Sequence, residues 1–98
     1  MNRGEIWALA DGRNFLIIGL TGLEEAYGAV LGIVLHDVGR YPETAMSIAI
    51  GDPFPCTAVA VNVAQLRVDR FDGAKLIGPV DAAAMVRVDA ALRAVQDL

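Results

Sequence analysis

Hydrophobic residues before Val80 come in short runs that are separated by glycine, proline and charged residues. The run at residues 15–20 is continuous, which is typical of a strand buried on both faces, and residues 28–35 form a second continuous run. At residues 44–50 apolar and polar or small residues alternate with period two, so one face of that strand should be buried. These patterns predict a chain built mainly of short β-strands.

Three further stretches are expected to be strands; they cover residues 3–10, 57–66 and 71–77. The first ends at Asp11-Gly12, a dipeptide that favours a tight hairpin turn. The last should stop before Pro79, because proline cannot donate a hydrogen bond to a neighbouring strand. Polar connections are predicted at residues 21–27 and 36–42.

The periodicity changes after Val80, where apolar residues recur at steps of three and four and predict an amphipathic helix. Its apolar positions are Ala84, Val88, Ala91, Leu92 and Val95. Asp81 is the expected N-cap residue. Six short strands followed by one helix predict a mainly β or α+β domain. So short a sheet avoids open edges best by closing into a small barrel.

The composition is that of one compact domain spanning residues 1–98. Hydrophobic residues make up 55% of the chain and charged residues 20%, which is enough to form a core. No apolar run approaches the ~20 residues of a membrane span, and the first residues do not look like a signal peptide. We therefore expect a cytoplasmic protein. Cys56 is the only cysteine, so it is expected to act as a small buried hydrophobic residue.

The charge balance limits the kinds of partner. Eight basic and twelve acidic residues give a net charge of −4, which opposes non-specific attraction to a polyanion. Any role with nucleic acid must therefore rest on a local basic patch. The single histidine and the acids Glu24, Glu25 and Asp37 do not have the spacing of metal ligands. We expect neither a metal site nor a cofactor.

An ordered set of short motifs runs through nearly the whole chain. The motifs are Arg-Gly-Glu-Ile-Trp at residues 3–7, Arg-Asn-Phe-Leu-Ile at 13–17, Leu-Arg-Val-Asp-Arg at 66–70, and the closing segments 78–81 and 88–92. In order and spacing they resemble the MazF/PemK family of toxins. The resemblance implies an SH3-like barrel of the MazF/CcdB type with a C-terminal helix. It also implies a homodimer that cleaves single-stranded RNA at specific sequences and is neutralised by a cognate antitoxin.

The resemblance also implies where the chemistry takes place. In the family, an arginine at the start of the second strand and a serine or threonine after the third strand meet at the scissile phosphate. Arg13 matches the first position, and His36 stands where the hydroxyl residue is usual. A histidine titrates near neutral pH and can transfer a proton, whereas an arginine supplies permanent charge to a phosphate. The residues expected to bind substrate are Asp37, Arg40, Gln65 and Arg67.

Each candidate also has a simpler interpretation. Arg13 can be a solvated surface charge, His36 a structural histidine, and Arg67 part of a charge-balanced face with Asp69. A second hypothesis is therefore a catalytically degenerate MazF-fold protein that acts through antitoxin binding or as a CcdB-like gyrase inhibitor. It is favoured by His36 in place of the hydroxyl, by the acidic net charge and by the short first connection, where the family often has a long loop.

Overall fold

The computed structural model describes residues 1–42 and 44–96. Most elements are short strands, as the sequence pattern predicts. In chain order the elements are β1 (Glu5–Ala8), β2 (Asn14–Ile17), α1 (Leu23–Tyr27), β3 (Ala29–Val34), β4 (Ser47–Ile50), β5 (Cys56–Val59), β6 (Val63–Arg67), the 3-10 helix η1 (Val68–Phe71), β7 (Lys75–Pro79) and α2 (Ala82–Gln96). None of the helices in this part of the chain is long and apolar enough to cross a membrane.

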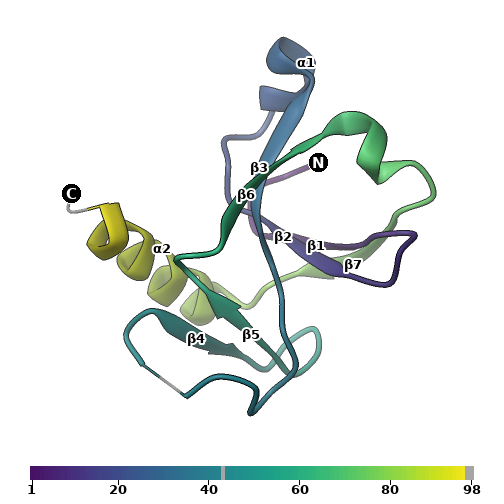
Figure 1. The fold of residues 1–98 in the computed structure, drawn as a ribbon. Coiled ribbons are helices and arrows are strands. Elements are labelled where there is room, and N and C mark those ends of the chain that lie inside the picture. Colours follow the sequence, from purple (N-terminus) through teal and green to yellow (C-terminus); the bar gives the residue numbers. More distant parts are fainter. Residues whose placement is uncertain (43, 97–98) are drawn as a thin grey trace.

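The strands form two antiparallel sheets, one of five strands in the order β6-β3-β2-β1-β7 and one made of β4 and β5. The main chain of His36, just after β3, joins them through two hydrogen bonds with Thr57 of β5, at 2.9 and 2.8 Å. Helix α2 packs against β4, on the side where the small sheet faces the large one (Figure 1). The predicted class, mainly β with a C-terminal helix, is confirmed.

The strand expected at residues 57–66 is two strands, so the described part of the chain has seven strands rather than six. A turn at residues 60–62 separates β5 from β6, and the Asn62 N–H donates to the Val59 carbonyl at 2.9 Å. Alternating valines continue through the turn, although Val61 at its tip is 61% exposed. The hydrophobic pattern therefore concealed the break, because neither glycine nor proline marks it.

The last predicted strand was also misplaced. Residues 68–71 form η1, and the strand that follows begins at Lys75 and runs through Pro79. Phe71 is buried and packs edge-on against Phe15 with ring centroids 5.7 Å apart, which draws this turn of helix onto the sheet. Pro79 is tolerated because β7 is an edge strand with one unpaired side.

The predicted connection at residues 21–27 contains the short helix α1. Helix α1 has no buried residue, so it lacks the apolar face by which a helix is recognised in a sequence. Its ends are marked instead by Gly22 and Gly28, both in the left-handed region, where glycine is favoured.

The core has two parts, one on each face of the five-stranded sheet. Leu16 belongs to the larger cluster, which is shared with the small sheet and α2, whereas Phe15 and Ile17 belong to the smaller one. The strand predicted to be buried on both faces is therefore confirmed. Cys56 is buried in the larger cluster as expected, and burial raises the pKa of its thiol to about 11, so the thiol stays neutral near pH 7.

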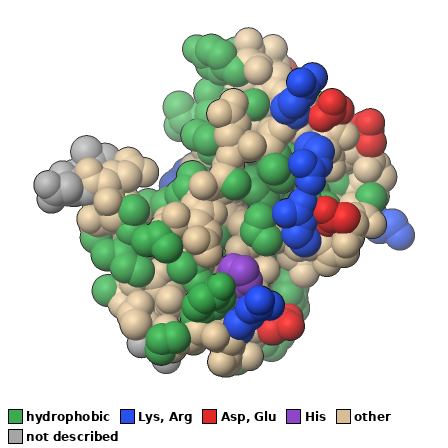
Figure 2. Space-filling model, viewed as in Figure 1, with side chains coloured by type: hydrophobic (Ala, Val, Ile, Leu, Met, Phe, Trp, Pro, Cys, Tyr) green, Lys and Arg blue, Asp and Glu red, His purple; other side chains and the backbone are tan. Residues whose placement is uncertain are grey.

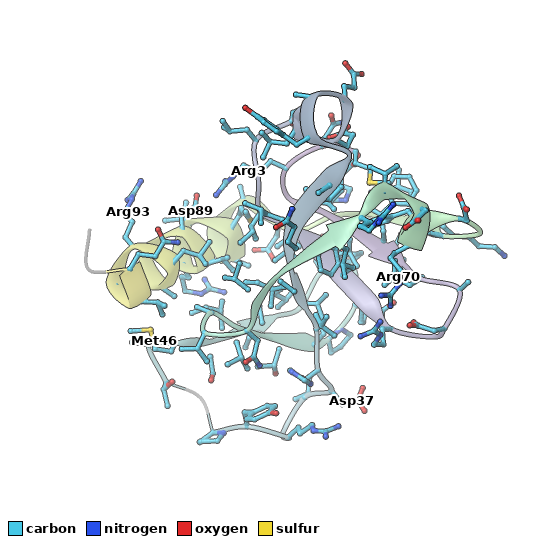
Figure 3. The ribbon with its side chains drawn as sticks, turned by 45° about the horizontal axis from the view of Figure 1, so that its top comes forward. Arg3, Asp37, Met46, Arg70, Asp89 and Arg93 are labelled. Carbon is cyan, nitrogen blue, oxygen red and sulfur yellow. The ribbon has the colours of Figure 1, made fainter. Side chains whose placement is uncertain are left out.

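Helix α2 is formed as the periodicity predicts. Asp81 is its N-cap, because its Oδ2 accepts a hydrogen bond from the Ala84 N–H at 3.0 Å. The residues that face the core are Ala84, Val88, Ala91 and Leu92. Beside this face, Asp89 pairs with the guanidinium of Arg3, which also donates to the Ile18 carbonyl (Figure 3). The Arg3 of the opening motif thus ties the N-terminus to the helix.

Gly32 in the middle of β3 leads to a prediction about stability. A methyl group at this position would lie 2.2 Å from the Phe15 ring and 2.4 Å from the Leu16 carbonyl oxygen, and neither group can move without disturbing the sheet. We expect Gly32→Ala to lower the free energy of unfolding by about 2 kcal/mol, measured by urea denaturation. Gly51→Ala is the matched control, because nothing lies within 4 Å of the added methyl group. Equal stability of the two variants would contradict this packing.

Candidate active site

Arg13 lies at the end of the tight connection between β1 and β2. Its carbonyl accepts the Leu9 N–H at 2.7 Å, and its own N–H donates to Asp11 Oδ1 at 3.0 Å. Gly12 takes a positive φ of 94° between them, a conformation that glycine adopts without strain. The Asp-Gly turn predicted from the sequence is therefore formed, and it fixes the backbone of Arg13 at the start of the strand.

His36 lies just beyond the end of β3, the strand next to β2. Its two main-chain hydrogen bonds to Thr57 fix its backbone, and its half-buried ring lies against Tyr41 with centroids 4.8 Å apart. The antiparallel register pairs Phe15 with Val34. Continuing that register outward brings Arg13 opposite His36. Sheet pairing thus places together two residues that are far apart in the sequence.

An open cavity of about 380 Å³ lies at this end of the sheet. It is lined by Gly12, Arg13, Asn14, Val34, Leu35, His36, Asp37 and Arg40. Four of the six residues singled out in the sequence therefore line one cavity, namely Arg13, His36, Asp37 and Arg40. Two guanidinium groups and an imidazole around one opening can hold an anion and exchange a proton with it.

The structure does not bring the other two candidates into this cavity. Gln65 on β6 is paired with Leu31 and lines a separate, smaller cavity of about 170 Å³ with Tyr27. The Arg67 side chain is 84% exposed and lies 3.7 Å from an Asp69 carboxylate oxygen, which is the charge-balanced arrangement weighed above. A role for Gln65 and Arg67 in binding RNA stays a prediction.

Asp11 and Arg70 are two neighbours of the site that the sequence did not single out. Asp11 Oδ2 lies 2.9 Å from both Nε and Nη2 of Arg13 and 3.9 Å from Nη2 of Arg70. The hydrogen bonds from the side chain and then the backbone of Arg13 hold the pKa of Asp11 below its usual value. Asp11 could have been predicted to contact Arg13, because the two are only two residues apart. No feature of the sequence near Arg70 predicts that it lies beside this turn.

Metal ligands do not gather anywhere in the part of the chain that the structure describes. Across residues 1–42 and 44–96, histidine, cysteine and acidic side chains form no group of three or more that could hold a metal ion. The chemical groups at the cavity are instead guanidinium, imidazole and carboxylate.

Comparisons with known proteins identify the fold. No family model matches the chain, and no curated protein matches its sequence. Solved structures match its fold, and the following three examples align with the whole chain. An endoribonuclease from a mycobacterial species matches with a TM-score of 0.86, 21% identity and 92% of its own chain covered. An endoribonuclease in complex with its cognate antitoxin, also mycobacterial, matches with a TM-score of 0.85, 20% identity and 96% of its own chain covered. A MazE-MazF structure from Deinococcus radiodurans matches with a TM-score of 0.82, 13% identity and 97% of its own chain covered. The chain therefore has the fold of the MazF endoribonuclease toxins.

Proposed function

We propose that this chain is the toxin of a type II toxin-antitoxin system, an endoribonuclease that cleaves single-stranded RNA at specific sequences in the cytoplasm. The observation that carries the proposal is the position of Arg13 and His36 on adjacent strands at one open cavity, in a chain with the MazF fold. Fold likeness alone does not determine function, so the proposal depends on this pair of side chains.

The proposed reaction is attack of a ribose 2′-hydroxyl on the adjacent phosphorus. The new O2′–P bond forms as the P–O5′ bond breaks, which leaves a 2′,3′-cyclic phosphate and a 5′-hydroxyl. His36 accepts the proton of the 2′-hydroxyl and then donates it to the leaving O5′, which becomes the 5′-hydroxyl, while Arg13 stabilises the charge on the phosphorane oxygens. Asp37 and Arg40 line the same cavity, so they are placed to bind the nucleotide around that phosphate. This reaction uses side chains alone and calls for no metal ion.

A line of basic side chains on one face supports RNA as the substrate despite the net charge of −4. Lysine or arginine side chains follow one another down one side of the face in Figure 2, and the histidine lies in line with them. Acidic side chains accompany several of these cations. A surface of this kind can bind a phosphate chain locally while the molecule as a whole stays acidic.

The direct test is to incubate the purified protein with a long unstructured RNA and to map the new ends. Ends with a 5′-hydroxyl and a 2′,3′-cyclic or 3′-phosphate, formed equally in EDTA, support the proposal. Intact RNA at high protein excess supports the alternative, a degenerate MazF-fold protein that binds an antitoxin or inhibits gyrase. That alternative is favoured by one observation, the engagement of the Arg13 guanidinium by Asp11. A gyrase supercoiling assay distinguishes its two forms.

We infer two protein partners, a cognate antitoxin and a second copy of the chain. One of the similar endoribonucleases is in complex with its cognate antitoxin, and the Deinococcus structure is a MazE-MazF complex. An antitoxin segment that blocks this site would carry acidic groups toward Arg13 and apolar side chains toward the surrounding surface. Since this chain is itself acidic, apolar contacts should supply most of the affinity.

The proposed dimer contact is a groove between α2 and the β3–β6 edge of the large sheet, with apolar side chains on one part of its wall. Leu31 and Val63, on these neighbouring strands, are 38% and 40% exposed. They line a hollow of about 410 Å³ with Ile18 and Leu92, and the rest of its wall is polar: Arg3, Asp89, Arg93 and Gln96. Since β6 is an edge strand, this surface is open to a partner, and a second copy would remove it from water.

Leu31→Glu should weaken the dimer by roughly tenfold or more, because the partner would have to bury a carboxylate in an apolar contact. Sedimentation over a range of micromolar concentrations measures the change. Leu76→Glu is the matched control, since Leu76 is 50% exposed on β7, the opposite edge of the same sheet. A wild-type protein that is monomeric throughout this range would contradict both the contact and the dimer.

A further inference from the structure

The Asp11 carboxylate lies between two arginines that come from different parts of the fold. Arg13 immediately precedes β2, and Arg70 lies in η1, which follows β6. Oδ2 of Asp11 accepts a hydrogen bond from Nε of Arg13 at 2.9 Å and lies 2.9 Å from Nη2 of the same guanidinium. It also lies 3.9 Å from Nη2 of Arg70. The three side chains form a cluster in which a single negative charge is shared by two positive ones.

The backbone on both sides of this cluster is firmly held. The Arg13 N–H donates to Asp11 Oδ1, which closes the turn. On the other side, Phe71 is buried next to Arg70 and anchors η1, and the Val68 N–H donates to the Gly28 carbonyl at 2.9 Å. The fold therefore fixes the backbone positions of the two arginines independently of the carboxylate.

The carboxylate occupies the edge of Arg13 that would bind a phosphate. Guanidinium groups bind carboxylates and phosphates through the same pair of parallel N–H donors. All three side chains are about half exposed, between 45% and 50%, so water screens their attraction and an incoming anion can displace Asp11 at low cost. Arg13 also lines the cavity with His36, so an anion that displaces Asp11 from Arg13 is bound at the proposed active site.

We propose that Arg13 and Arg70 form a binding site for a backbone phosphate of single-stranded RNA, and that Asp11 fills this site as an internal competitor until RNA displaces it. The inference rests on the proposed function for its ligand. It assigns a phosphate-binding role to Arg70 and an inhibitory role to Asp11. It also explains why Asp11 binds the Arg13 guanidinium in a protein that is still able to cleave RNA.

The test uses Asp11→Asn in the full chain. The asparagine side-chain oxygen can still accept the Arg13 N–H and keep the turn, whereas its neutral amide no longer competes with phosphate. Binding is measured by fluorescence anisotropy with a labelled single-stranded RNA of mixed sequence that carries 2′-O-methyl groups and cannot be cleaved. We expect roughly fivefold tighter binding, the scale of one exposed ion pair. Glu25→Gln makes the same charge change at an exposed position in α1 and should change affinity less than about twofold.

Arg70→Gln supplies an independent measurement. Removing one phosphate contact should reduce the slope of log affinity against log salt by about 0.7 for a single strand. Arg87→Gln is the control, because Arg87 is an exposed residue of α2, and Figure 3 shows this helix on the other side of the molecule from Arg70. In the double variant Asp11→Asn/Arg70→Gln, the gain from the first change should shrink, since the site it opens has lost one arginine.

The results separate this inference from the proposed function. If the chain is not a nuclease, unmodified RNA stays intact while Asp11→Asn still tightens binding. If the inference is wrong, unmodified RNA is cleaved but Asp11→Asn binds within twofold of Glu25→Gln, or Arg70→Gln leaves the salt slope unchanged. Absence of measurable binding by the folded Asp11→Asn protein also overturns it.

Discussion

Arg13→Ala is expected to reduce RNA cleavage by about 10²-fold or more, the effect of losing one preorganised donor to the transition state. The loss should appear in kcat as well as in kcat/KM, because the charge on the phosphorane oxygens develops only as the reaction proceeds. Stability should hardly change, since the Arg13 side chain is 45% exposed and its partner Asp11 is equally solvated. Thermal unfolding of the same preparation measures this second point.

Arg87→Ala is the matched control for Arg13→Ala. It removes the same charge from an exposed position of α2, outside both the cavity that contains Arg13 and the proposed dimer groove. Its cleavage rate should stay within about threefold of wild type, because exposed charges beyond a Debye length of ~8 Å are screened. An Arg13→Ala protein that cleaves RNA as fast as this control would remove Arg13 from the mechanism and leave it a solvated surface charge.

His36→Ala should lower the cleavage rate by about 10²-fold and abolish the limb of the pH–rate profile that depends on proton transfer by this side chain. The fold should survive, because the hydrogen bonds that join His36 to Thr57 belong to the main chain. The assay is single-turnover cleavage of one defined RNA between pH 5 and pH 9, with circular dichroism to confirm that the variant is folded.

His36→Thr separates the two hypotheses for this position, because it restores the kind of residue usual in the resembling family. If His36 transfers the proton, His36→Thr is slower than wild type and loses the limb. If the chain is a degenerate toxin, the hydroxyl creates or raises cleavage. Equal activity of wild type, His36→Ala and His36→Thr would make the side chain structural, held against Tyr41.

Part of the site could be predicted because its residues belong to motifs of the resemblance, and part could not. Arg13 and His36 were identified in this way, and the register of β2 with β3 brings them together. Gln65 was identified by the same reasoning but lies in another cavity, because β6 is on the far side of β3 from β2. A sequence motif specifies residue types, whereas strand order decides which of them share an opening.

The sequence by itself determined the elements that depend only on residues close together in the chain. The burial of β2 on both faces followed from a continuous apolar run, and the start of α2 followed from Asp81 and the change of period. The Asp-Gly turn before Arg13 was equally clear. Each of these depends on residues within a few positions of one another, so the pattern contains the whole cause.

Tertiary structure decided the features whose cause lies elsewhere in the chain. The alternation of valines does not show where β5 ends and β6 begins. Val61 follows the same pattern as the buried Val59, and only the fold leaves Val61 exposed at a turn. Residues 68–71 became a 3-10 helix through packing of Phe71 on Phe15. Arg70 reached Asp11 for the same reason, since that packing places η1 beside the first turn. Such contacts depend on long-range packing, which overrides local preference and leaves no trace in the spacing of neighbouring residues.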